Sequence, residues 1–243
     1  MAVEAGDGRV HLQEVLADNE AELQDKLQQH PELLRLEELG LEGPLLIVGR
    51  TSLPSGAVDL VGIARNGAIL VIEFKTGRQN SDFRHALAQM VDYGSHLWER
   101  DPDDFETTVA RRYFATAHAG QASERNESIA AAATATWPDQ TDEELAAFTD
   151  GWHAVLASGG FHFVLVAQRF TPTTTRTMRY MNQVSQPARF CAVELVRFTG
   201  PDMNVYEGRT VVRHDRSTTA SRTAALTTEQ RLLGGWCFRH RFR

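Results

Sequence analysis

The sequence predicts an α/β protein in which a central mixed β-sheet is flanked by helices on both faces. Two apolar runs, 57–64 and 68–75, are joined by Arg65-Asn66-Gly67, a combination typical of a β-hairpin. Both runs are apolar on both faces, which indicates central strands that are covered from two sides. Segments with helical periodicity precede and follow the hairpin, and a strand–helix–strand pattern comes last.

The elements before the hairpin are a helix and one strand. Residues 1–17 are expected to be a flexible N-terminus. A helix is predicted to begin at Asp18 or Asn19, because either side chain can cap it, and Pro31 ends its regular part. The apolar run 44–50 predicts a first short strand.

The elements after the hairpin are a helix, an insertion and a closing unit. A helix is predicted over 82–99. The acidic insertion that follows, at about 100–158, is rich in Ala and Thr and is expected to be helical in pieces. The closing unit is predicted to be a strand over 161–170, a helix over 171–184 and a strand over 189–199.

Charge is unevenly distributed along the 243 residues, whose net charge is −7. One domain is expected over 18–207, followed by a Ser/Thr/Arg-rich tail over 208–243. The tail holds eight arginines against Asp215 and Glu229, a local charge of +6, so the acidic excess lies in the domain. An acidic balance argues against a protein that coats nucleic acid by charge alone. It is compatible with an enzyme whose carboxylates hold metal ions.

Neither a membrane segment nor an export signal is visible. No run approaches the ~20 apolar residues that a membrane helix needs. The start, MAVEAGDGRV, has neither a basic segment nor an apolar stretch. The two cysteines, Cys191 and Cys237, have no metal-binding or redox spacing. We therefore expect a cytoplasmic protein with no membrane partner.

Three charged residues, Asp59, Glu73 and Lys75, lie where the hairpin should be buried. Buried charges are costly unless they are paired or bind a metal, so the three form either an internal salt bridge or a site. A two-residue turn would put Asp59 and Glu73 on opposite faces. A three-residue turn with Gly67 in the left-handed region would place them directly opposite each other, with Lys75 on the same face.

Two close carboxylates beside a lysine suit a hard divalent cation. Mg²⁺ takes carboxylate oxygens, main-chain carbonyls, waters and phosphate oxygens. It generates a nucleophilic hydroxide and stabilises charge on a phosphoryl group. A lysine can help to deprotonate the water, whereas the guanidinium of an arginine stays protonated. The chain has 23 arginines and only two lysines, Lys26 and Lys75. A lysine rather than an arginine at position 75 of the strand therefore favours a chemical role for its amino group.

The pattern Asp–x13–Glu–x–Lys on a hairpin resembles the PD-(D/E)xK nuclease superfamily, which has a restriction-endonuclease-like sandwich fold. The stretches "NEAELQDKLQQHPELL", "GAVDLVGI", "LVIEFKTG" and "ALAQMVDYGSHL" are similar to the nuclease domain of the NucS/EndoMS-type endonucleases. The resemblance covers roughly 18–99 and 160–199. The usual Pro–Asp pair is Val58–Asp59 here.

The resemblance implies a role for each residue of the hairpin cluster. Asp59 and Glu73 would bind Mg²⁺ or Mn²⁺, assisted by the main-chain carbonyl of Phe74. Lys75 would be the catalytic lysine. Glu20, in the first turn of the first helix, would be an auxiliary acid, although the helix dipole favours an acidic residue there in any case.

Four residues that follow the hairpin are further candidates. Gln89 and Tyr93 match the QxxxY element of RecB-like nucleases and lie one turn apart on a helix. Gln89 would contact the site, and Tyr93 is either a nucleic-acid contact or a core residue. Arg78 and Arg84 are either phosphate-binding residues or solvated surface arginines.

The expected function is a metal-dependent deoxyribonuclease that hydrolyses phosphodiester bonds in DNA, in repair or in defence against foreign DNA. Single-stranded, branched and mismatched DNA are all candidate substrates. The alternative is a catalytically silent nucleic-acid-binding module on the same fold. A homodimer is the candidate assembly.

Overall fold

The computed structural model describes residues 2–5, 8–53, 56–76, 83–115, 127–201 and 203–213. Its strands are β1 (Ala2–Ala5), β2 (Gly8–His11), β3 (Gln13–Val15), β4 (Leu46–Leu53), β5 (Gly56–Ile63), β6 (Ile69–Lys75), β7 (His162–Ala167), β8 (Arg189–Thr199) and β9 (Asn204–Val212). Its α-helices are α1 (Glu20–Gln29), α2 (Phe83–Leu97), α3 (Pro102–Phe105), α4 (Arg111–Phe114), α5 (Ile129–Thr136), α6 (Asp142–Ser158) and α7 (Pro172–Val184). Short helical turns are η1 (Pro31–Leu34), η2 (Leu36–Leu39) and the π-helical η3 (Glu106–Ala110).

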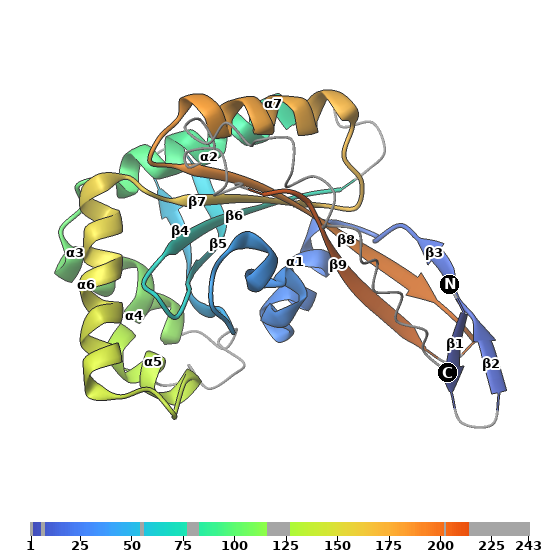
Figure 1. Cartoon of the computed structure of the whole chain (residues 1–243), viewed down its shortest axis with the longest axis horizontal. Helices are drawn as coiled ribbons and strands as arrows, with labels where there is room; N and C mark the ends of the chain where they lie inside the picture. The colour runs from blue at the N-terminus through green and yellow to red at the C-terminus, as the bar shows by residue number, and fades with distance from the viewer. Residues whose placement is uncertain are drawn as a thin grey trace, which may run out of the picture.

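Seven of the strands form one mixed, strongly curled sheet (Figure 1). The strand order is β3-β8-β7-β6-β5-β4, and β9 pairs with β8. β7 runs parallel to both β6 and β8, and the other neighbours are antiparallel. The remaining two strands, β1 and β2, form an antiparallel pair of their own. From α1 to β8 the predicted order of helix, three strands, helix, insertion, strand, helix and strand is confirmed, whereas β1, β2, β3 and β9 were not predicted.

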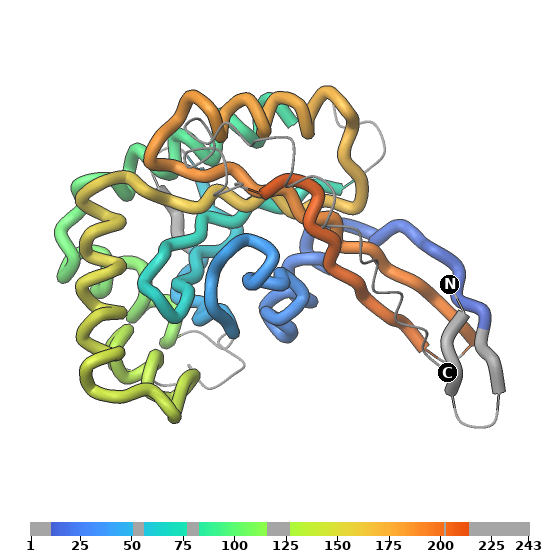
Figure 2. The backbone as a smooth tube through the Cα atoms, viewed as in Figure 1, coloured from blue at the N-terminus to red at the C-terminus, as the bar shows by residue number. Residues whose placement is uncertain are grey.

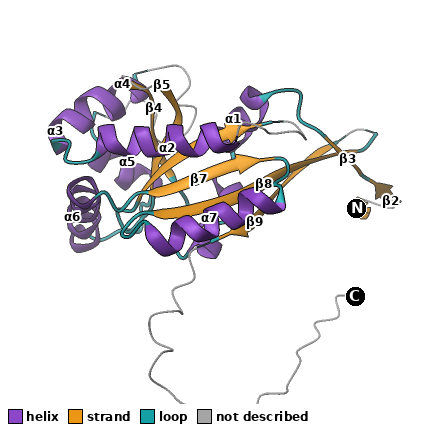
Figure 3. Ribbon diagram, turned by 90° about the horizontal axis from the view of Figure 1, so that it is seen from above, coloured by secondary structure: helices purple, strands orange, loops and turns teal. Residues whose placement is uncertain are grey.

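Helices cover the sheet from both sides. In Figure 1, α2 and α7 lie on one face and α1 lies on the other, while the view from above in Figure 3 shows α6 at one end of the strands. Every residue of β6 except Lys75 is buried, and Val58 and the last four residues of β5 are buried as well. The α/β class and the central position of the hairpin strands are therefore confirmed.

Local sequence explains where two of the flanking helices begin. Asn19 caps α1, its side chain accepting a hydrogen bond from the Glu22 N–H. Thr171 caps α7 in the same way, and Pro172 occupies the first helical turn, where its missing N–H costs nothing. Leu23 and Leu27 of α1 are fully buried, so one stripe of that helix is fixed against the sheet.

The acidic insertion forms α3, η3, α4, α5 and α6 in the described residues, as expected for a helical segment. Its longest helix, α6, packs against the turn between β5 and β6. A Cβ atom on Gly67 would lie 2.6 Å from the Phe148 carbonyl oxygen, and Gly67 also has a φ of +81°. Only glycine fits both restrictions. The insertion thus contacts the hairpin at the end opposite to Lys75.

The structure departs from the expected organisation near both chain ends. The segment 1–17 was predicted to be flexible, yet β3 pairs with β8 and Leu12 is only 4% exposed. The basic tail was predicted to begin at residue 208, but β9 continues to Val212. Its helical signal near residues 227–236 lies outside the described residues.

The strands β3, β8 and β9 continue beyond the helices as an extension of the sheet (Figure 2). Leu12, Val196 and Phe198 form a small core there, separate from the main one. An ion-pair cluster ties α1 to the extension: Glu22 Oε1 accepts from Arg197 at 2.7 Å and from the Tyr206 hydroxyl at 2.9 Å. In the described part of the chain, no helix is long and apolar enough to cross a membrane.

Candidate functional site

The register of the β5–β6 hairpin places Asp59 opposite Glu73. Leu60 pairs with Ile72, and Ile63 pairs with Ile69. The turn is closed by a hydrogen bond from the Ala64 N–H to the Ala68 carbonyl, which leaves three residues in the loop. The expected three-residue turn with Gly67 in the left-handed region is confirmed.

The side chains of Asp59, Glu73 and Lys75 form a cluster at the end of the hairpin away from this turn. Lys75 Nζ donates to Glu73 Oε1 at 2.7 Å, and the Phe74 N–H donates to Asp59 Oδ2 at 2.9 Å. Glu73 is 3% exposed, and its Oε2 atom is buried with no hydrogen-bond partner among the described residues. One oxygen of this buried carboxylate thus has no hydrogen-bond donor among the described residues. An unsatisfied buried acceptor costs free energy, so it is not expected in an ion pair whose only role is structural.

Glu20 joins the cluster from the first turn of α1. Its Oε2 atom lies 3.8 Å from Lys75 Nζ, and its Oε1 atom accepts from the Thr76 N–H at 3.2 Å. The first helix therefore places an acidic side chain beside the hairpin cluster. The auxiliary catalytic role remains a prediction.

Electrostatics distinguish the two charged partners at the centre of the cluster. Burial, together with the nearby Asp59 carboxylate, raises the pKa of Glu73 to about 7, although Lys75 acts in the opposite direction. Burial lowers the pKa of Lys75, but Glu73, Glu20 and Asp59 outweigh it, so that pKa is raised above its usual value. Lys75 therefore stays an ammonium, while Glu73 gains or loses a proton near neutrality unless another cation compensates its charge.

The two QxxxY residues lie one turn apart on α2. Gln89 Nε2 is 3.5 Å from the Tyr93 hydroxyl, and the buried Gln89 Oε1 atom has no partner among the described residues. The Tyr93 hydroxyl donates to the Ala57 carbonyl at 2.8 Å. Tyr93 is 1% exposed, so a contact with nucleic acid stays a prediction that no exposed surface of this side chain supports.

Of the two predicted phosphate-binding arginines, Arg78 and Arg84, only Arg84 lies within the described residues. Arg84 is exposed near the start of α2 and lines a cavity of about 360 Å³ together with Phe83, Leu87 and four threonines at the start of α7. In the part of the chain that the structure describes, no hydrogen bond or ion pair joins Arg84 to the Asp59–Glu73–Lys75 cluster.

Two residues that the sequence did not indicate lie beside the cluster: Gln24, which contacts Asp59, and Arg50, which contacts Gln24. Gln24 Nε2 donates to the Asp59 carbonyl at 2.7 Å, and Arg50 donates to Gln24 Oε1 at 3.0 Å. Gln24 lies one turn after Glu20 on α1, a spacing that places both on one face of the helix. That spacing was the one signal from which Gln24 could have been predicted.

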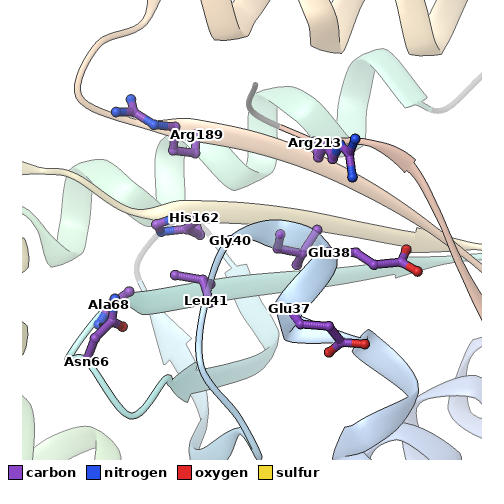
Figure 4. A pocket seen from close by; sticks show the side chains of 10 residues that line it. Glu37, Glu38, Gly40, Leu41, Asn66, Ala68, His162, Arg189 and Arg213 are labelled. Carbon is purple, nitrogen blue, oxygen red and sulfur yellow. Dashed lines mark hydrogen bonds between the residues drawn. The ribbon is translucent and has the colours of Figure 1, made fainter. Parts of the chain in front are cut away.

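A cavity of about 370 Å³ opens at the other end of the sheet (Figure 4). It is lined by the first residues of two parallel strands, His162 and Arg189, and by Glu37 and Glu38 of η2. The side chain of Arg189 already donates to the Gln186 amide oxygen and to the Pro187 carbonyl. This cavity does not include any residue of the Asp59–Glu73–Lys75 cluster.

The donor set of the cluster fits a hard divalent cation in one respect that the structure shows directly. The Asp59 carboxylate is near enough to Glu73 to raise its pKa, and one buried Glu73 oxygen lacks a partner among the described residues, as expected of an atom that binds an ion. Within the described ranges, no group of three or more His, Cys, Asp or Glu residues is arranged to hold a metal. The main-chain carbonyl of Phe74, which the resemblance implies as a further ligand, stays a prediction.

Comparisons with known proteins give no family for this chain. No family model matches it, no curated protein is similar to it, and no solved structure resembles it.

Proposed function

We propose that this protein is a Mg²⁺- or Mn²⁺-dependent deoxyribonuclease with a restriction-endonuclease-like core. The observation that supports this best is the Asp59–Glu73–Lys75 cluster, in which a buried Glu73 oxygen has no partner in the described residues. A buried ion pair kept only for stability is normally fully hydrogen-bonded. The order α1-β4-β5-β6-α2-β7, with β6 and β7 parallel, is also compatible with such a core.

Asp59, Glu73 and the Phe74 carbonyl would hold the cation. The bound ion would supply Lewis-acid charge that activates a water molecule and offsets phosphate charge. The Phe74 N–H fixes one oxygen of Asp59 and Lys75 fixes one oxygen of Glu73, so each carboxylate keeps its second oxygen for other ligands.

Lys75 would bind the phosphate, and Glu20 would accept the proton. The Lys75 ammonium lies between Glu73 and Glu20, at 2.7 and 3.8 Å, and its charge would attract a phosphate oxygen of DNA. Glu20 is 45% exposed at its side chain, so it can accept a proton from solvent-side water. The acidic helix α6 contacts the opposite end of the hairpin, and this arrangement keeps its carboxylates from repelling DNA at the cluster.

The test is cleavage of a panel of labelled DNAs with Mg²⁺ or Mn²⁺. The panel contains single-stranded, branched, mismatched and fully paired DNA. Glu73→Gln and Lys75→Met should each reduce cleavage at least about a hundredfold, since both remove a group that acts in the reaction. Lys26→Met is the matched control for Lys75→Met, because Lys26 is the only other lysine in the chain. Glu32→Gln changes an exposed glutamate and is the control for Glu73→Gln.

Three results would decide the matter. Loss of cleavage in the cluster variants alone would establish the nuclease. Equal cleavage by all variants would place the reaction elsewhere and refute the assignment of the cluster. Metal binding without cleavage of any DNA would favour the alternative, a catalytically silent nucleic-acid-binding module.

A further inference from the structure

A β-bulge lies at Asp59, on the side of β5 that faces β4. Thr51 pairs with Val58 and Gly49 pairs with Val61, so the single residue Arg50 lies opposite both Asp59 and Leu60. A bulge interrupts the ladder of main-chain hydrogen bonds and redirects a side chain, and bulges are common beside active sites. The main chain at Asp59 therefore needs a partner that the ladder does not provide.

Gln24 supplies that partner from α1. Its Nε2 atom donates to the Asp59 carbonyl at 2.7 Å, and Gln24 is only 5% exposed. The two residues are 35 positions apart in the sequence, so the contact locks a helix to a strand rather than closing a local turn. One turn earlier on the same helix, Glu20 accepts from the Thr76 N–H at the end of β6. The helix thus holds both strands of the hairpin.

Arg50 fixes which way the Gln24 amide points. An amide presents one acceptor oxygen and one donor nitrogen, and the two are easily exchanged by rotation. Arg50 has only donors, and it contacts Gln24 Oε1 at 3.0 Å. Only one orientation therefore satisfies both neighbours: the oxygen on Arg50 and the nitrogen on the Asp59 carbonyl. The bulge places Arg50 where this is possible.

We propose that Gln24, oriented by Arg50, is a positioning residue that sets the bulge at Asp59 and thereby the metal-binding geometry of its carboxylate. This inference rests on the proposed function, in which Asp59 is a metal ligand. Gln24 acts through the Asp59 main chain and touches neither metal nor DNA. Partners of this kind, which hold a ligand from outside, typically change metal affinity or activity by about 10- to 100-fold when they are removed.

The sharpest variant is Gln24→Glu. A carboxylate keeps the contact with Arg50 and nearly the same shape, but it has no proton to donate to the Asp59 carbonyl. Gln28→Glu is the matched control, because it makes the same change one turn further along α1, where Gln28 contacts the Tyr113 hydroxyl instead. Arg50→Gln is a second variant, since it removes the orienting cation from an exposed position.

Two measurements test the proposal. Amide hydrogen exchange in the metal-free protein reports the hydrogen bond from the Phe74 N–H to Asp59, and that amide should exchange at least about tenfold faster in Gln24→Glu. Calorimetric titration with Mn²⁺ should show an affinity lowered about tenfold or more. Arg50→Gln should also raise the exchange rate of the Phe74 amide and lower the affinity for Mn²⁺, but by smaller factors than Gln24→Glu. Gln28→Glu should match the wild type in both.

The outcomes separate this inference from the proposed function. Unchanged Phe74 exchange and unchanged Mn²⁺ affinity in Gln24→Glu would overturn the inference, even if the wild type cleaves DNA. Equal effects in Gln24→Glu and Gln28→Glu would overturn it as well, because they would indicate a general loosening of α1. A wild type that neither binds Mn²⁺ nor cleaves DNA would instead refute the proposed function. In a cleaving wild type, a Gln24→Glu variant whose relative activity recovers as pH is lowered would support the inference, because a protonated glutamate regains the donor.

Discussion

Two glutamate–cation clusters, Glu22 with Arg197 and Glu73 with Lys75, lie on either side of α1 and differ in how completely they are hydrogen-bonded. On one side, Glu22 accepts from Arg197, from Tyr206 and, through Oε2, from the Asp18 N–H, so both oxygens have partners. On the other side, Glu73 of β6 has, among the described residues, a partner for Oε1 alone. The first arrangement is what a structural ion pair needs, and the second leaves a capacity to bind something else.

The pKa values differ in the same way. Burial raises the pKa of Glu22, but the Asp18 N–H, Tyr206 and Arg197 outweigh it and hold that pKa below its usual value. Burial and Asp59 raise the pKa of Glu73 to about 7. A buried carboxylate that is fully hydrogen-bonded remains charged, whereas one that is incompletely hydrogen-bonded does not. The two glutamates therefore differ in whether their oxygens have hydrogen-bond partners among the described residues, and not only in the charges around them.

The largest expected difference between the clusters is the loss in free energy of unfolding when the basic side chain, Arg197 or Lys75, is replaced. Arg197→Met should lower the free energy of unfolding by about 3 kcal/mol, because it leaves Glu22 partly buried without its main partner. Lys75→Met should cost much less at pH 6, since Glu73 can take up a proton. Urea denaturation at pH 6 measures both. Equal losses would mean that the Glu73 ion pair is as structural as that of Glu22.

The response to Mg²⁺ should also separate the two glutamates. In the wild type and in Glu22→Gln, Mg²⁺ at about 100 times its dissociation constant should add about 2.7 kcal/mol to the free energy of unfolding. Glu73→Gln should gain almost nothing, because it lacks a ligand. Thermal denaturation with and without Mg²⁺ is the measurement. An undiminished gain in Glu73→Gln would remove Glu73 from the metal site.

The pH dependence of stability follows from the pKa of Glu73. Its folded-state pKa of about 7 lies above the unfolded value of 4.5, so the folded chain holds the extra proton between these pH values. The stability contribution is fully present below about pH 4.5 and is lost as pH rises through 7, at no more than about 1.4 kcal/mol per pH unit. Glu73→Gln should flatten this slope when the two proteins are compared in chelator. Parallel curves would contradict the raised pKa.

The smallest expected effect concerns the tyrosines near the two clusters. Tyr93→Phe should cost about 1 kcal/mol, since it loses one hydrogen bond to the neutral Ala57 carbonyl. Tyr206→Phe should cost more, because its acceptor is the charged Glu22. Both differences are measurable by urea denaturation. A larger loss for Tyr93→Phe would indicate that its hydroxyl has a further role at the neighbouring cluster.

Local chemistry was sufficient to predict the hairpin and its charged residues. Gly67 fixes the turn length, the turn fixes the register, and the register brings Asp59 to Glu73. The same reasoning could not predict the strand β9, most of whose residues are only half-buried and show no clear alternation of apolar and polar side chains. Nor could it predict β3, which is a strand only because β8 lies beside it.

Gln24 and Arg50 were not predicted because their roles depend on a bulge. The sequence of β5 shows no sign of the point where two residues face one on β4, since the irregularity arises from how both strands curl. The site's reactive groups could therefore be predicted from residue types and spacing, whereas the groups that hold them in place depend on contacts over 26 and 35 positions. Such contacts become visible only in three dimensions.

The short helix α1 has a mechanical consequence for the whole molecule. Its ten residues present Glu20 and Gln24 to the hairpin, and Glu22 to the extension of β3, β8 and β9. Because one helix contacts both, we expect a displacement of the extension to reach the Asp59 main chain through α1 as well as through the sheet.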